Sequence, residues 1–220
     1  MSTVTIPNQN APPMGSCVVW HDVTWDFYED FLREFRDRRC PHSYVNGELR
    51  ITSPSSRHEN PKRRIGRLVE TLTEELDLWC ISLGSTTLKR AFKDRGAEPD
   101  ECYLIANAQK VQDVDNYDLE TDPPPDLVVE IDVTAPSLNR LPVYATLGVP
   151  EVWVYDGETL QVGLRRDNDS YESSETSATF PTLPLREFAG WIDKGYETQN
   201  ETAWIRGFRE WVREKVKPGV

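Results

Sequence analysis

The chain has 220 residues and a formal net charge of −12, with 37 acidic and 25 basic side chains. Hydrophobic residues make up 38% of the sequence and aromatic residues 10%, which is enough for a buried core and argues against a disordered chain. This length fits one domain. The excess of negative charge argues against nucleic-acid binding through bulk charge, but basic residues gather at 57–67 and 89–95, where a local basic surface can form.

Neither a membrane segment nor a secretion signal is visible in the sequence. The longest apolar runs, such as 127–131, are too short to cross a bilayer, and residues 1–16 lack the apolar core of a signal peptide. The four cysteines form no C-x-x-C pair, which indicates reduced thiols rather than a zinc site or a disulfide framework. We therefore predict a cytoplasmic protein with no membrane partner, in which residues 1–20 form a flexible tail.

The first predicted elements are a helix and a hairpin. Thr24 precedes a segment in which Phe27, Phe31 and Phe35 recur every four residues, which predicts an N-capped amphipathic helix. Residues 43–53 then predict a β-hairpin, because their central Asn-Gly pair suits the two positive φ values of a tight turn.

The middle of the chain alternates helical and strand-like patterns. Apolar residues recur at helical spacing from about 60 to 79. Strand-like stretches follow at 84–92 and 100–105, and the acidic, proline-ended segment 109–125 predicts a surface loop. The β-branched run 127–133 is typical of a central strand that is covered on both faces.

The last third predicts a short helix, three strands and two helices. The helix of 137–147 is stopped by a glycine, and Pro142 either kinks it or moves its start to about Leu141. The C-terminal segment 185–217 carries apolar residues that indicate two helices packed on a sheet. The three strands are expected at 151–155, 161–165 and 171–174. Such a mixture of strands and helices predicts an α/β or α+β domain.

Acidic residues stand next to these predicted strands. Asp100 opens one apolar run, and Glu130 and Asp132 lie two residues apart, on the same face of the predicted central strand. Because an unpaired acid in an apolar run is costly to bury, we favour metal ligation for Glu130 over pairing with an arginine at a strand end. For Asp100 the alternative is a simple turn, and Asp126 is interpreted as capping the loop before the strand.

Four motifs occur in a recognisable order. They are Asn-Gly-Glu-Leu at 46–49, Pro-Asp at 99–100, Pro-Asp-x-x-x-Glu at 125–130 and Gly-Val-Pro-Glu-x-Trp at 148–153. In this order they resemble the Uma2 family of the restriction-endonuclease-like, PD-(D/E)xK superfamily, over roughly residues 44–156. The resemblance implies a mixed central sheet flanked by helices. It predicts a restriction-endonuclease-like domain over 21–184 and a C-terminal helical extension, 185–220, packed on that domain.

The resemblance also implies a chemistry. The family's metal-binding acids correspond to Asp100 and Glu130, which would bind Mg²⁺ or Mn²⁺ for the hydrolysis of DNA phosphodiester bonds, and the hairpin acid corresponds to Glu48, at the edge of the site. From its place on the same face as Glu130, we expect Asp132 to add a carboxylate that strengthens this metal site or binds a second ion. The family also implies a homodimer.

The chain departs from the family pattern at the expected lysine. Its two possible positions hold Asp132 and Arg140. Arginine can stabilise phosphate charge but stays protonated, so it cannot shuttle a proton. We therefore predict an endonuclease impaired by Arg140, with Asp100, Glu130, Arg140 and Glu48 as its catalytic residues. The alternatives are a non-catalytic binding or assembly module that retains the fold, and an unrelated acidic metal-dependent hydrolase.

Overall fold

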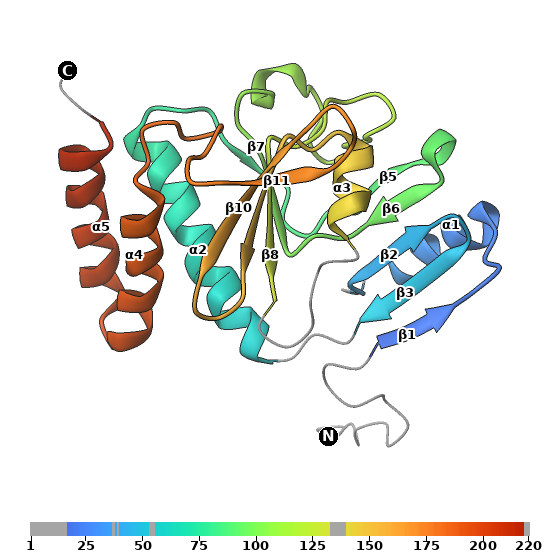
Figure 1. The fold of residues 1–220 in the computed structure, drawn as a ribbon, viewed down its shortest axis with the longest axis horizontal. Coiled ribbons are helices and arrows are strands. Elements are labelled where there is room, and N and C mark those ends of the chain that lie inside the picture. Colours follow the sequence, from blue (N-terminus) through green and yellow to red (C-terminus); the bar gives the residue numbers. More distant parts are fainter. Residues whose placement is uncertain (1–16, 37, 39, 53–55, 133–139, 218–220) are drawn as a thin grey trace, which may run out of the picture.

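The computed structural model describes residues 17–36, 38, 40–52, 56–132 and 140–217, with the backbone alone for residues 56–58. Most of the predicted tail and the first residues of the helix expected from 137 therefore lie outside the described residues. Figure 1 shows two β-sheets side by side, with helices α2, α4 and α5 on the face of the larger sheet that is remote from the smaller one.

The large sheet has the strand order β11-β10-β9-β8-β7-β4. Strands β8 and β9 are parallel, and the other neighbours are antiparallel. Its strands are β4 (Ile81–Ser82), β7 (Glu101–Leu104), β8 (Leu127–Ile131), β9 (Glu151–Tyr155), β10 (Leu160–Arg165) and β11 (Tyr171–Ser174). A mixed sheet flanked by helices confirms the predicted fold class.

The small sheet is antiparallel, with the order β1-β3-β2-β6-β5. Asn46 and Gly47 have φ values of 45° and 84°, which confirms the predicted hairpin turn. Its strands are β1 (Cys17–Trp20), β2 (His42–Val45), β3 (Glu48–Thr52), β5 (Leu88–Arg90) and β6 (Arg95–Ala97). The prediction had placed residues 17–20 in the flexible tail. They form β1 instead, because a Cys-Val-Val-Trp segment suits a strand and pairs with the open edge of β3.

The helices of the described residues follow the predicted order. They are α1 (Trp25–Phe35), α2 (Ser56–Glu75), α3 (Leu141–Leu147), α4 (Leu185–Glu197) and α5 (Glu201–Lys215), with short 3₁₀ turns η1 (Ala91–Lys93) and η2 (Ala108–Lys110). Thr24 Oγ1 accepts a hydrogen bond from Phe27 N at 3.2 Å, which confirms the predicted N-cap. The start of α3 at Leu141 is also confirmed, since proline is favoured in the first turn of a helix.

Two aromatic side chains differ from their predicted positions. The buried face of α1 carries Tyr28 and Phe31, whereas Phe27 is 49% exposed. Tyr28 is buried because its ring stacks on Tyr44 of the small sheet, with the ring centroids 4.5 Å apart. Trp79, predicted on the apolar face of the second helix, is 65% exposed because α2 ends at Glu75.

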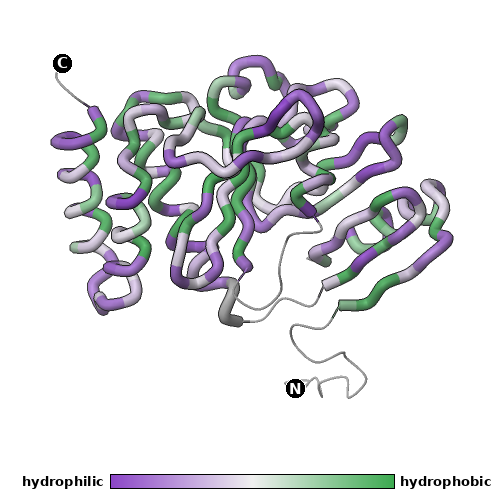
Figure 2. The backbone as a smooth tube through the Cα atoms, in the orientation of Figure 1, coloured by the Kyte–Doolittle hydropathy of each residue, from purple (hydrophilic) through white to green (hydrophobic). Residues whose placement is uncertain are grey.

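The main core fills the space between the large sheet and helices α2, α4 and α5. Figure 2 shows the hydrophobic residues that run along the central strands of this sheet. Trp153 of β9 is fully buried there and packs edge to face against Phe188 of α4, with the ring centroids 5.2 Å apart. A second cluster on the opposite face joins Val128 of β8 to Tyr144 and Leu147 of α3. Together, the two clusters bury both faces of β8, as its apolar sequence predicted.

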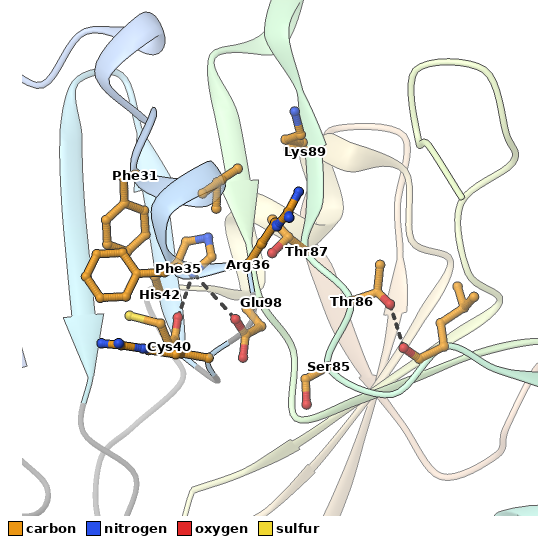
Figure 3. A pocket seen from close by; sticks show the side chains of 13 residues that line it. Phe31, Phe35, Arg36, Cys40, His42, Ser85, Thr86, Thr87, Lys89 and Glu98 are labelled. Carbon is orange, nitrogen blue, oxygen red and sulfur yellow. Dashed lines mark hydrogen bonds and ion pairs between the residues drawn. The ribbon is translucent and has the colours of Figure 1, made fainter. Parts of the chain in front are cut away.

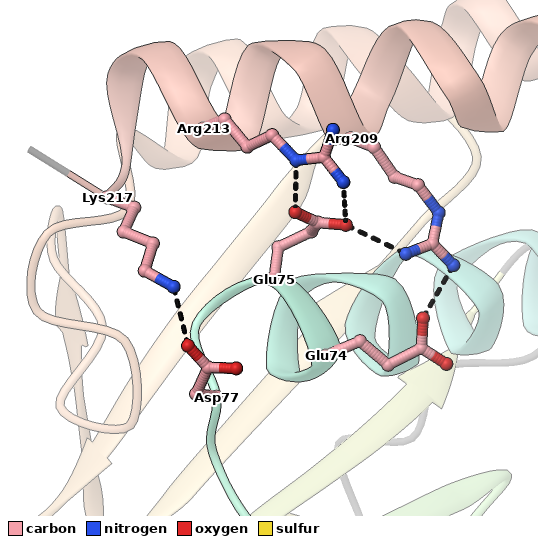
Figure 4. Close-up of polar contacts among 6 residues, drawn as sticks. All are labelled: Glu74, Glu75, Asp77, Arg209, Arg213 and Lys217. Atoms are coloured by element: carbon pink, nitrogen blue, oxygen red, sulfur yellow. Dashed lines mark hydrogen bonds and ion pairs between the residues drawn. The ribbon is translucent and has the colours of Figure 1, made fainter. Parts of the chain in front are cut away.

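Ion pairs attach α5 to α2, as Figure 4 shows. Arg213 Nε lies 2.6 Å from Glu75 Oε2, and Arg209 Nη1 lies 2.8 Å from Glu75 Oε1. Below, the α2–α5 ladder means these two contacts together with the pairs Arg209–Glu74 and Lys217–Asp77. Within the described ranges, no helix is long and apolar enough to cross a membrane.

Candidate functional site

The candidate site lies at the C-terminal end of β8, on the side that faces α3. Side chains alternate along a strand, so Leu127, Val129 and Ile131 enter the main core while Val128 and Glu130 face α3. Glu130 is fully buried. Glu101 of β7 pairs with Val129, so the next pair along the antiparallel ladder brings Asp100 opposite Glu130. The sequence therefore folds these two acids onto one face of the sheet.

Asp100 is anchored by the backbone of β8. Its Oδ2 atom accepts a hydrogen bond from Ile131 N at 2.9 Å, and the residue is only 6% exposed. This side-chain hydrogen bond continues the backbone pairing of β7 with β8 beyond its last backbone pair. It holds the Asp100 carboxylate beside the strand that carries Glu130.

Both oxygens of Glu130 contact side chains of the α3 region. Oε1 accepts a hydrogen bond from Tyr144 Oη, and Oε2 lies 2.6 Å from Arg140 Nη2. The arginine contact is an ion pair by distance but lacks the angles of a hydrogen bond. Arg140 stands at the N-cap position of α3 and Tyr144 follows one turn later, so an i, i+4 spacing presents both side chains to one acid.

The electrostatics follow from this burial. The pKa of Glu130 is raised to about 8, mainly by burial; the charges of Asp100 and Asp132 also raise it, and the charge of Arg140 acts in the opposite direction. Burial lowers the pKa of Arg140, but the charges of Glu130 and the other acids outweigh this effect and keep it above its ordinary value. Arg140 is therefore a permanent cation among three acids.

The donor types suit a hard divalent cation, but the protein supplies few of them. In the parts of the chain that the structure describes, no group of three or more His, Cys, Asp or Glu side chains is arranged to hold a metal ion. Two carboxylates, from Asp100 and Glu130, fit a Mg²⁺ or Mn²⁺ ion that keeps several waters. Asp132 follows the end of β8, where its N–H donates to Tyr155 O at 2.7 Å, and its charge acts on Glu130.

The arginine partner of Glu130 is the arrangement that the sequence left as the alternative to metal ligation. The structure shows this pair, with the Glu130 side chain 0% and the Arg140 side chain 15% exposed. Arg140 thus contacts one of the oxygens that a metal ion would need. Metal ligation by Asp100, Glu130 and Asp132 stays a prediction.

Glu48 and Asp126 have other surroundings. Glu48 lies in a separate hollow of about 280 Å³ between the small sheet and α3, where it pairs with Arg50 at 2.6 Å and His21 at 3.4 Å. Asp126 Oδ2 accepts from Ile105 N at 2.7 Å and from Asn107 N at 2.9 Å, which confirms its predicted loop-capping role.

The sequence interpretation missed the roles of Tyr144 and His42. The one-turn spacing of Tyr144 from Arg140 was a usable signal. His42 gave none, because Tyr28, the partner of its second ring nitrogen, comes from another element. Its Nδ1 lies 2.8 Å from Cys40 O, a carbonyl that can only accept, so Nδ1 carries the proton and Nε2 accepts from Tyr28 Oη at 2.8 Å. Burial lowers the pKa of His42 to about 4, and the charge of Arg140 contributes to this shift.

Comparisons with known proteins identify the family. The structure resembles a crystal structure of "a putative nuclease belonging to DUF820 from Anabaena variabilis ATCC 29413", with a TM-score of 0.48 and 14% sequence identity, over 79% of this chain and 98% of that one. No curated protein matches the chain. The model of the Uma2 family, described as "Putative restriction endonuclease", matches residues 25–194, which is more than half of the sequence. The chain therefore belongs to the Uma2 family.

Proposed function

We propose that this protein is a metal-dependent endonuclease that hydrolyses DNA phosphodiester bonds, with an activity that Arg140 weakens. The observation that carries the proposal is the buried group of Asp100, Glu130, Arg140 and Tyr144 at the end of β8. Family membership supports the nuclease assignment. The arginine contact at 2.6 Å supports the impairment, because the guanidinium neutralises the acid that a metal ion would use.

Asp100 and Glu130 are the residues that would hold Mg²⁺ or Mn²⁺, with Asp132 as an additional carboxylate. When bound, such an ion activates water and neutralises charge on the phosphate. Tyr144 orients Glu130 by donating a hydrogen bond to Oε1. Arg140 can stabilise a phosphate group but cannot accept a proton. Glu48 has no part in this proposal, since it pairs with Arg50 in a separate hollow.

Nicking of supercoiled plasmid DNA in Mn²⁺ tests this function. We expect nicking by the unaltered protein, a loss of roughly 100-fold or more in Glu130→Ala and Asp100→Ala, and no loss in Glu172→Ala, whose side chain is 64% exposed. Arg140→Lys should nick faster than the parent. Because Glu130→Ala leaves a buried arginine without its partner, thermal unfolding and Mn²⁺ calorimetry on the same variants separate misfolding from the loss of the metal.

A second candidate is a non-catalytic binding or assembly module that retains the nuclease fold. The buried Arg140–Glu130 pair favours it, because it satisfies the acid without a metal. The module is the correct assignment if neither the parent nor Arg140→Lys binds Mn²⁺ or nicks DNA. Hydrolysis of a small phosphoester without DNA affinity would instead indicate a different hydrolase.

We also propose that the enzyme works as a homodimer in the cytoplasm, since two copies supply the two sites that double-strand cleavage needs. Analytical ultracentrifugation at micromolar concentration should give twice the monomer mass of 25.3 kDa. A monomer that still linearises plasmid would contradict the dimer.

A further inference from the structure

A hollow in the described part of the molecule is lined by none of the buried acids of the candidate site. It has a volume of about 630 Å³ and separates α1 and the start of β2 from the segment 83–89. Figure 3 shows Phe35, Cys40 and His42 on one side of this cavity and Ser85, Thr86 and Thr87 on the other. None of the predicted site residues lines it, so it requires its own explanation.

The charge of this cavity is opposite to that of the whole chain. Arg36, Arg38 and Lys89 line it together with a single carboxylate, that of Glu98, although the net charge of the protein is −12. The two arginines are exposed, whereas Glu98 is only 7% exposed. Lys89 pairs with Glu29 at 2.5 Å, and the two arginines add two further positive charges at the rim. This distribution favours a ligand with negative charge at the rim.

The interior suits a flat, partly polar group. The wall combines the half-buried ring of Phe35 with the hydroxyl groups of Ser85 and Thr87. The floor residue His42 has both ring nitrogens in hydrogen bonds and is neutral at physiological pH, so it adds no charge. Cavities of a few hundred Å³ hold small organic ligands, and aromatic side chains beside cations are the usual surroundings of unpaired nucleotides.

The cavity also adjoins the candidate active site. Ser85 Oγ donates a hydrogen bond to the backbone carbonyl of Asp100 at 3.3 Å, and Glu98 precedes Asp100 by two residues. On the other side of this contact, Lys62 Nζ of α2 lies 2.9 Å from Ser85 Oγ. A strand held in the cavity would therefore pass close to Asp100.

We propose that this cavity binds one unpaired nucleotide of a nucleic-acid strand, with the phosphate at Arg36 and Arg38 and the base between Phe35 and Thr87. The inference rests on the proposed nuclease function, and it specifies the substrate as a single strand or a locally opened duplex. The strand enters beside Asp100 through the Ser85 segment.

Fluorescence anisotropy in EDTA tests binding without cleavage. The probes are a labelled single-stranded DNA and the duplex of the same sequence. We expect the single strand to bind at least tenfold more tightly than the duplex. The double variant Arg36→Glu/Arg38→Glu should lose about tenfold or more of the affinity for the single strand, and its salt slope should fall by roughly 0.7, because one neutralised phosphate is lost.

A matched control separates the cavity from bulk charge. Arg33→Glu/Arg206→Glu makes the same change in net charge at two exposed arginines that do not line the cavity, and it should change affinity by less than threefold. Thr87→Trp fills the cavity without changing charge and should also weaken binding, whereas Thr121→Trp, on an exposed loop, should not. Equal losses in the two double variants, or tighter binding of the duplex, would overturn the proposal.

The two proposals fail in different ways. If nicking depends on Glu130 but Arg36→Glu/Arg38→Glu binds single strands like the parent, the nuclease function stands and the cavity assignment is wrong. If the parent never nicks DNA yet binds single strands through the cavity, the nuclease function is wrong and the cavity assignment stands.

Discussion

Two sets of ion pairs in this molecule differ chiefly in their contact with solvent. In the α2–α5 ladder, the side chains of Arg213 and Glu74 are 61% and 59% exposed, and only Glu75, at 9%, is nearly covered. In the pair at the end of β8, Glu130 is fully buried and Arg140 nearly so. The chemical groups are the same, but one set lies at the surface and the other inside the fold.

The comparison indicates that the buried pair adds little to the stability of the fold. Water screens the ladder, so each of its contacts contributes little but also costs little to form. Transferring Glu130 and Arg140 out of water costs several kcal/mol per ion, which their attraction offsets only in part. A fold that needed only stability would be served by apolar side chains there. The buried pair is therefore the better candidate for a functional group.

Breaking the buried pair should produce the largest effect. Above pH 8, where Glu130 with its pKa of about 8 is ionised in the parent, Arg140→Met leaves the buried carboxylate without its cation, so we expect the free energy of unfolding to fall by about 3–5 kcal/mol. The double variant Glu130→Leu/Arg140→Met should recover most of this loss, because no charge is then buried. Denaturant unfolding above pH 8 measures both, and a loss below about 1 kcal/mol in the single variant would mean that the pair is hydrated.

A fall in pH should affect the stability of the two regions over different pH ranges. His42, beside the buried pair, is neutral in the fold with a pKa of about 4, whereas in the unfolded chain its pKa is about 6.5. The unfolded state thus binds a proton first, and stability should fall by about 3 kcal/mol as the pH drops from 6.5 to 4. His42→Gln should flatten this part of a plot of unfolding free energy against pH.

The ladder should respond only at lower pH. Hydrogen bonds from Arg213 lower the pKa of Glu75, so its contribution is present above the ordinary value of 4.5 and is lost as the pH falls through the lowered one. If stability does not change between pH 6.5 and 5 in the parent, or changes equally in His42→Gln, then His42 is not the group that titrates.

The smallest effect is expected in the ladder. Arg213→Ala should lower the free energy of unfolding only slightly in low salt and still less in 1 M salt, because water surrounds its side chain and screens its contact with Glu75. Arg206→Ala, an exposed residue on the same helix, serves as the control and should change stability by less than that. A cost of several kcal/mol, unchanged by salt, would show that the ladder behaves like the buried pair.

Local patterns predicted much of the fold because their physical causes are local. The Asn46-Gly47 turn, the Thr24 cap and the start of α3 at Leu141 each depend on a few neighbouring residues. The short strand at 17–20 was missed because four residues show too little alternation to predict a strand. These residues are extended because they pair with β3. The exposure of Trp79 depends on where α2 ends, a boundary that periodicity alone does not set.

By itself, the sequence determined the order of elements, the burial of β8 and the family, because alternation, turn residues and motif order are properties of neighbouring positions. The tertiary structure alone decided the partners of the acids. It brought Arg140 and Tyr144 to Glu130, moved Glu48 into another hollow and placed His42 between Tyr28 and Cys40. Most of these contacts join different elements of the fold, and they form only when strands and helices pack together.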